Sequence, residues 1–245
     1  MPNYKLVLCY DGSRYKGWQK QGNTENTIQA KLETALSGIV GESVEVNGSG
    51  RTDAGAHARM QVASFRAKTD LTAAELLSKL RGVLPEDIGA VSLEEANPRF
   101  HARLNCVGKT YVYRVWNSAQ PNVFERKFMC TVADTLDLDA MNAAARHLIG
   151  SHDFSAFCSV KNMKKSAVRT IDEIRIERLG GEIRFTVSGS GFLYNMVRII
   201  VGTLLEVGKG SLSPDAIAEI LASLDRGNAG PTAPAKALCL WEVRY

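Results

Sequence analysis

The chain has 245 residues, of which 45% are hydrophobic and 23% charged, and its formal net charge is +4. This length accommodates one large domain or two small ones, and the apolar fraction is that of a folded protein with a proper core. Five scattered cysteines without a C-x-x-C pair argue for reduced, packing thiols and against a zinc framework.

No segment predicts a membrane span or a secretory signal. The most apolar tract, Met196 to Leu205, contains Arg198 and is shorter than the roughly 20 apolar residues that span a bilayer. His147 and His152 lack a set of Cys or acidic partner ligands. We therefore expect a cytoplasmic protein with no membrane partner, no metal and no bound cofactor.

The first half predicts the element order β-α-β-β-α-β, the ferredoxin-like unit. The first segment alternates like a half-buried strand, with Leu6 and Leu8 on one side and Lys5 opposite, and Thr72 with Glu75 has the spacing of a capping box. The expected strands cover residues 4–10, 44–46, 60–65 and 90–93, and the expected helices cover 27–39 and 72–80.

The second half of the sequence repeats this element order less regularly. Gly180-Gly181 indicates a hairpin turn, and Ser213-Pro214 indicates a helix start. The expected strands cover 107–116, 128–132, 174–176, 183–187 and 238–243, and helices cover 138–148 and 193–207. We predict an α+β fold in which two ferredoxin-like βαββαβ units share a largely antiparallel sheet with a central catalytic cleft. The N-terminal subdomain is expected over 1–105 and the C-terminal one over 106–245.

The segment from Gly48 to His57 is the first candidate site. It places Asp53, Arg51 and three glycines in one short loop between two predicted strands. Glycines leave a neighbouring carboxylate accessible to a ligand, and loops on rigid scaffolds often carry chemistry. The alternative is that Asp53 only stabilises a turn.

Arg198 is the second candidate, because it lies in a helix that is apolar on nearly every side. A buried guanidinium is costly unless a carboxylate or phosphate pairs with it. Asn195, Arg198 and Gly202 share one helix face, so something is expected to approach that face. A structural arginine paired with a surface acid is the alternative.

The strand over 107–116 places Lys109, Tyr111 and Tyr113 on one face. Such a face can stack a nucleic-acid base, or the tyrosines can simply be cross-strand packing.

Two stretches of the chain are basic and contain no acid. Arg103 and Lys109 lie between Glu95 and Glu125, and a second group lies between Asp153 and Asp172: Lys161, Lys164 and Lys165. Aromatic residues interleave with both, which suits RNA with splayed bases, although a solvated polar face is an alternative.

Five ordered motifs resemble the TruA-type tRNA pseudouridine synthases along residues 4–245. They are Tyr10-Asp11-Gly12-Ser13 with Gly17-Trp18-Gln19, Gly50-Arg51-Thr52-Asp53-Ala54-Gly55-Ala56-His57-Ala58, Phe100-His101-Ala102-Arg103, Lys109-Thr110-Tyr111-Val112-Tyr113 and Gly191-Phe192-Leu193-Tyr194-Asn195-Met196-Val197-Arg198. The resemblance implies Asp53 as the catalytic aspartate, Tyr111 as the tyrosine beside the target uracil and Arg198 as the arginine that pairs with the aspartate. Arg51 and His57 match flanking motif positions, and we expect them, with Asn195, to contact substrate.

The resemblance also implies the reaction and the partner. Such enzymes are cofactor-independent isomerases that convert uridine to pseudouridine at positions 38, 39 and 40 in the anticodon stem-loop of tRNA, and they work as homodimers. A carboxylate nucleophile and an everted uridine suit this chemistry. Two rival functions remain on the residues alone: a non-catalytic RNA-binding module, and a hydrolase of nucleosides or glycosides.

Overall fold

The computed structural model describes residues 1–160 and 165–245, so the candidate RNA contacts Lys161 and Lys164 lie outside the described residues. The chain forms two compact units. The first comprises Met1–Val107 with Cys239–Tyr245, and the second comprises Gly108–Leu238. This division differs from the expected one at the C-terminal strand, which joins the first unit because Cys239 and Leu240 pair with a strand there.

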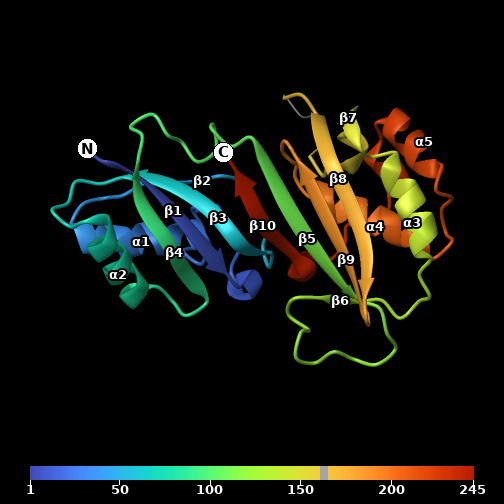
Figure 1. Cartoon of the computed structure of the whole chain (residues 1–245), viewed down its shortest axis with the longest axis horizontal. Coiled ribbons are helices and arrows are strands. Elements are labelled where there is room, and N and C mark those ends of the chain that lie inside the picture. Colours follow the sequence, from blue (N-terminus) through green and yellow to red (C-terminus); the bar gives the residue numbers. More distant parts are fainter. Residues whose placement is uncertain (161–164) are drawn as a thin grey trace. The chain divides into compact units, whose positions relative to one another are not determined.

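The first unit has the predicted βαββαβ order with the C-terminal strand added (Figure 1). Its elements are β1 (Asn3–Tyr10), α1 (Ile28–Val40), β2 (Val46–Gly48), β3 (His57–Arg66), α2 (Ala73–Val83), β4 (Ile88–Ala96) and β10 (Leu238–Arg244), with a short 3-10 turn over Gly12–Arg14. β1 lies between β4 and β3 and is antiparallel to both.

The far edge of β3 is shared by two strands. β2 pairs antiparallel with its Ala63–Phe65 end, and β10 pairs parallel with its His57–Ala58 end. β3 therefore begins inside the predicted site loop, at His57, three residues before the expected strand start.

The two helices of the first unit begin where the sequence places their caps. Thr27 accepts a hydrogen bond from the Ala30 N–H at the start of α1. Thr72 and Glu75 form the predicted capping box at the start of α2. Leu6 and Leu8 of β1 are completely buried, which confirms the expected alternation and places the core on one face of this sheet.

The second unit has an antiparallel sheet in the order β5-β9-β8-β7, with the helix Leu138–Arg146 packed beside β8 (Figure 1). Its elements are β5 (Gly108–Trp116), β6 (Cys130–Thr131), α3 (Leu138–Arg146), β7 (Gly150–Asp153), β8 (Val168–Leu179), β9 (Glu182–Gly189), α4 (Met196–Gly208) and α5 (Ala216–Ser223). β5, α3, β8, β9 and α4 follow the same β-α-β-β-α order as the first unit. The α+β class with mostly antiparallel pairing is thus confirmed.

Two helix starts of the second unit differ from expectation. α4 begins at Met196 instead of residue 193, because Asn195 has a left-handed backbone, with φ 62°. α5 begins at Ala216, although Ser213 still acts as a cap, since its Oγ accepts from the Ala216 N–H at 3.3 Å. Within the described ranges, no helix is long and apolar enough to cross a membrane.

Candidate functional site

The loop that carries Asp53 is anchored on both sides of this residue. The Thr52 Oγ1 lies 2.8 Å from the Tyr10 hydroxyl in a buried hydrogen bond, and the Thr52 carbonyl accepts from the Trp18 N–H at 3.0 Å. The Asp53 carbonyl accepts from the Ala56 N–H at 3.1 Å, and Asp53 itself is half-buried. The backbone that positions this carboxylate is therefore held by β1 and by the loop itself.

His57 and Gly12 join this loop to the turn that follows β1. The Gly12 N–H donates to His57 Nδ1 at 3.0 Å, so Nδ1 is the acceptor and the ring proton is assigned to Nε2. The Asp11 Oδ1 lies 3.2 Å from the same nitrogen. His57 is 4% exposed, so in this unit it is a buried support of the loop.

Gly12 permits the close approach of these two segments. A Cβ at this position would lie only 1.8 Å from the Ala56 carbonyl oxygen. Any side chain at residue 12 would therefore displace the loop between Asp53 and His57. Tyr10 and Gly12 are functional supports that sequence reasoning gave no role, although both lie in the first quoted motif.

Arg51 projects from the same loop and is exposed. Its Nε donates to the Gln19 Oε1 at 3.0 Å, and the Gln19 amide in turn donates to Gln29 Oε1 at 2.8 Å. Arg51 is thus an oriented surface cation two residues from Asp53, which suits contact with a phosphate.

Tyr111 lies on β5 of the second unit opposite Val187 and is 7% exposed. Its ring meets the Phe192 ring edge-on, with 5.2 Å between centroids. Tyr113, two residues on, is completely buried, and its hydroxyl donates to the Pro234 carbonyl at 2.9 Å. Burial raises the pKa of the Tyr113 hydroxyl. Of the two tyrosines, Tyr113 is therefore core packing and cannot stack on a base.

The Arg198 guanidinium is half-buried on the first turn of α4, as expected. Its Nε donates to the Ala233 carbonyl at 2.7 Å, and its Nη1 donates to Asn195 Oδ1 at 2.8 Å. The Asn195 amide also donates to Ser159 Oγ at 3.0 Å. Two predicted site residues, Asn195 and Arg198, are thus brought together, and their bonds fix the plane of the guanidinium.

The segment 230–234 is what approaches the polar face of α4. A Cβ on Gly202 would lie 1.8 Å from the Pro231 carbonyl oxygen, and one on Gly230 would lie 2.7 Å from the Thr203 Cα. The Ala233 N–H donates back to the Arg198 carbonyl at 3.1 Å. Glycines on both sides therefore allow the segment 230–234 to pack closely against α4 beside Arg198.

The candidate RNA contacts differ in exposure. Arg103 and Lys165 are exposed, whereas Lys109 on β5 is half-buried opposite Gly189. Exposed cations can reach phosphates without loss of packing, so Arg103 and Lys165 are the more accessible of the three.

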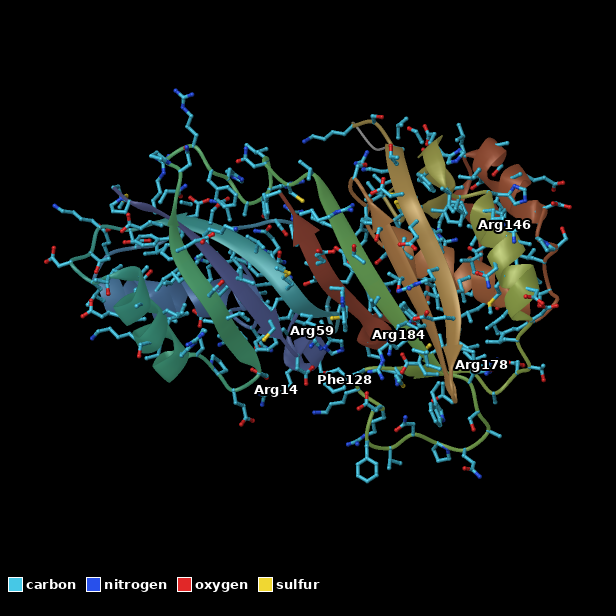
Figure 2. All side chains as sticks on the ribbon, viewed as in Figure 1. Arg14, Arg59, Phe128, Arg146, Arg178 and Arg184 are labelled. Atoms are coloured by element: carbon cyan, nitrogen blue, oxygen red, sulfur yellow. The ribbon has the colours of Figure 1, made fainter. Side chains whose placement is uncertain are left out.

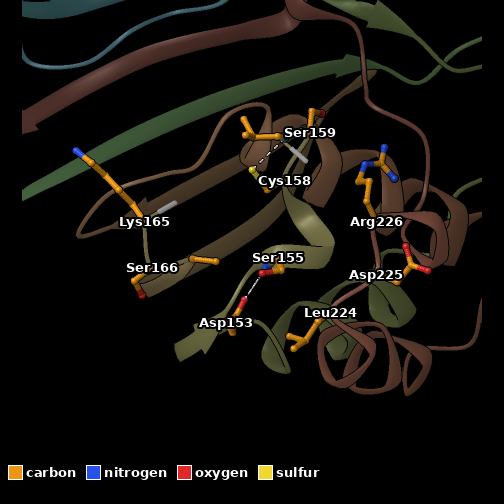
Figure 3. A pocket seen from close by; sticks show the side chains of 11 residues that line it. Asp153, Ser155, Cys158, Ser159, Lys165, Ser166, Leu224, Asp225 and Arg226 are labelled. Atoms are coloured by element: carbon orange, nitrogen blue, oxygen red, sulfur yellow. Dashed lines mark hydrogen bonds between the residues drawn. The ribbon is translucent and has the colours of Figure 1, made fainter. Parts of the chain in front are cut away.

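A hollow of about 590 Å³ lies in the second unit, and Lys165 is on its wall (Figure 3). It is lined by Asp153, Ser155, Cys158, Ser159, Val160, Lys165, Ser166, Ala167, Leu224, Asp225 and Arg226. Both signs of charge occur on its walls, and Ser159 connects it to Asn195. Tyr111 and Arg198 are not among its lining residues, so within the described part of the chain this hollow is not the reaction pocket.

A metal centre finds no support in the residues that the structure describes, since they contain no group of three or more His, Cys, Asp or Glu side chains placed to bind an ion.

Comparisons with known proteins bear on what these residues do. A family model described as tRNA pseudouridine synthase matches residues 7–105 and 144–245, which include Asp53 and Arg198. A Bacillus cereus protein named tRNA pseudouridine synthase A 2 is 46% identical over 245 residues, 100% of each chain. Proteins named tRNA pseudouridine synthase A are similar as well: one of a Bacillus species is 47% identical over 230 residues, 94% of each chain, and one of Brevibacillus brevis is 44% identical over 245 residues, 100% of each chain.

A solved structure, the crystal structure of a Cbf5-Nop10-Gar1 complex, aligns with a TM-score of 0.37 at 13% identity, over 82% of this chain and 45% of that one. This likeness is too low to establish a common fold.

Proposed function

This chain belongs to the tRNA pseudouridine synthase family, and from that membership we propose that it isomerises uridine at one or more of positions 38, 39 and 40 of the tRNA anticodon stem-loop, with Asp53 as the nucleophile. An isomerase that acts on tRNA follows from the family itself. The observation that carries the finer proposal is the position of Asp53, half-buried in a loop that Thr52 anchors to Tyr10 of β1 and that His57 anchors to Gly12 in the turn after β1.

The reaction needs no net gain or loss of atoms. The bond between uracil N1 and ribose C1′ breaks, the freed base turns, and C5 forms a bond to the same carbon while the C5 proton is lost and N1 gains one. A carboxylate suits this chemistry because it can attack, or stabilise, a centre with oxocarbenium character. The anchored backbone around Asp53 supports this role, since a nucleophile must be held within about 0.5 Å of its productive position.

Arg198 is proposed to pair with the Asp53 carboxylate in the complex with tRNA. An opposite charge nearby favours the charged form of a carboxyl group. The support is geometric: the hydrogen bonds to Ala233 and Asn195 hold the guanidinium plane in one orientation. A fixed guanidinium presents paired donors that match a carboxylate.

Tyr111 is proposed to contact the everted uracil and to accept the C5 proton. Its buried ring, packed edge-on against Phe192, offers a rigid surface to a base. Tyrosine is among the residues that act as general bases when their ionisation is assisted.

The remaining contacts are assigned to the RNA. Uridine inside a stem cannot reach a carboxylate, so the nucleotide must be everted at a cost of a few kcal/mol. Arg51, Asn195, Arg103, Lys109 and Lys165, together with Lys161 and Lys164, are proposed to contact substrate. His57, which was expected to do so as well, is buried and is instead proposed to hold the Asp53 loop in place. RNA shape more than base sequence then sets the specificity. The enzyme is proposed to act as a homodimer, in the cytoplasm where tRNA is processed.

The test uses unmodified tRNA carrying tritium at uridine C5. We expect tritium release by the wild-type protein, with pseudouridine mapped at one or more of positions 38, 39 and 40. Pseudouridine elsewhere in the tRNA would contradict the assigned positions. Binding without tritium release would favour the RNA-binding module, and free uracil in the product would favour the hydrolase.

A further inference from the structure

The loop of residues 117–129, between β5 and β6, exposes an aromatic side chain that the reaction does not use. Phe124 is 92% exposed and Val123 is 52% exposed. The loop projects from the second unit beyond the end of the β8–β9 hairpin (Figure 1). A large apolar side chain held in water on a surface loop is a feature of binding sites.

Internal hydrogen bonds hold the loop in one shape. The Trp116 Nε1 donates to the Gln120 carbonyl at 2.6 Å, and the Arg126 guanidinium donates to the Val123 carbonyl at 2.6 Å. The Asn122 Oδ1 accepts from the Glu125 N–H at 3.2 Å. The exposure of Phe124 is therefore a consequence of how the loop is built, since bonds on both sides direct the chain outward.

An ion-pair network ties the loop to the sheet beneath it. Arg114 on β5 donates to Glu125 at 2.7 Å and to both oxygens of Glu182 on β9, at 3.0 and 2.8 Å. Arg184 also donates to Glu182, at 2.9 Å. The acid next to Phe124 is thus neutralised by an arginine from the sheet.

The surface around the ring is basic. Arg126 and Lys127 follow Phe124 in the loop and are exposed. Arg178 lies near the end of the β8–β9 hairpin beside the loop (Figure 2), and its guanidinium donates to the side chain of Asn117 at the loop start, at 2.9 Å. An aromatic ring among cations is the combination that binds an unpaired nucleotide, because the base stacks and its phosphates meet the cations.

We infer that Phe124 stacks on an unpaired base of the bound tRNA, with Arg126 and Lys127 against the flanking phosphates. This inference rests on the proposed function for its ligand. A second copy of the chain fits less well, because a two-fold contact would bring the same cations of both copies together.

The experiment measures the Kd for unmodified tRNA and the sedimentation mass of Phe124→Ala, Phe124→Tyr and the wild type. Val168→Ala is the matched control, since Val168 is a 49% exposed apolar residue of the same unit at the far end of β8. Loss of one stacked base is expected to raise the Kd of Phe124→Ala about tenfold. The Kd of Phe124→Tyr is expected to stay within about twofold of the wild type, because a tyrosine ring still stacks on a base. The Kd of Val168→Ala is expected to stay within the same range, because this substitution removes no ring.

An unchanged Kd for Phe124→Ala would overturn the inference, and a lower sedimentation mass with an unchanged Kd would assign the ring to a contact between copies. These results leave the proposed function intact if the wild type still releases tritium. A wild-type protein that binds no tRNA would instead overturn both.

Discussion

Alanine substitution at two helical glycines should have opposite effects. Gly202 in α4 and Gly38 in α1 both lie inside helices, where glycine costs about 0.8–1.0 kcal/mol relative to alanine. A Cβ on Gly38 meets nothing within 4 Å, so Gly38→Ala should gain most of that free energy of unfolding. This gain raises Tm by about 2–4 °C in a protein of this size.

At Gly202 the same gain is outweighed by a clash. The new Cβ would lie 1.8 Å from the Pro231 carbonyl oxygen, and ordinary contact begins near 3.4 Å, so the segment 230–234 must move by about 1.6 Å. Overpacking of this kind costs about 1–3 kcal/mol. The Ala233 carbonyl in this segment accepts a hydrogen bond from the Arg198 guanidinium, so moving the segment also displaces Arg198. We therefore expect kcat to fall about tenfold or more.

The assay is thermal unfolding by circular dichroism, followed by tritium release measured well below either Tm. Gly38→Ala serves as the control, with raised Tm and unchanged kcat. A Gly202→Ala protein as stable and as active as Gly38→Ala would refute the assignment of the segment 230–234 as the support of Arg198.

Three further predictions concern other parts of the second unit. Tyr113→Phe removes a part-buried hydrogen bond to a backbone carbonyl and should lower the free energy of unfolding by about 0.5–1.5 kcal/mol with kcat retained. Tyr111→Phe should lower kcat on the order of a hundredfold with tRNA binding retained. A fully active Tyr111→Phe protein together with an inactive Tyr113→Phe protein would contradict both roles. Burial raises the pKa of Glu182, but hydrogen bonds from Arg114 and Arg184 outweigh it and hold this pKa below its ordinary value. Because the folded pKa is depressed, the resulting stability is present above about pH 4.3 and is lost as pH falls through the folded pKa. The free energy of unfolding of Glu182→Gln should therefore be lower than that of the wild type at pH 7, and it should fall less on acidification. Parallel curves of stability against pH for the two proteins would contradict this prediction.

Local signals in the sequence predicted most of the fold. The capping box at Thr72 and Glu75 is present, and Gly180-Gly181 is the turn between β8 and β9. These features depend on side chains a few residues apart, so a single sequence contains the information they need. The half-buried state of Arg198 followed in the same way from its apolar neighbours.

Features that depend on distant partners were not predicted. β7 lacks an apolar alternation, and it is a strand because Gly150 to Asp153 pair with β8. β2 begins two residues later than expected, since its register is set by β3. The left-handed Asn195 and the close approach of the segment 230–234 to α4 are likewise tertiary, because neither changes the local pattern of residues.

The most direct test of the account is tritium release under single-turnover conditions by Asp53→Asn, with tRNA binding measured on the same preparation. The substitution keeps the size of the side chain and removes its charge. We predict no detectable release and a Kd close to that of the wild type. Release at the wild-type rate would contradict the central claim that the carboxylate of Asp53 performs the chemistry.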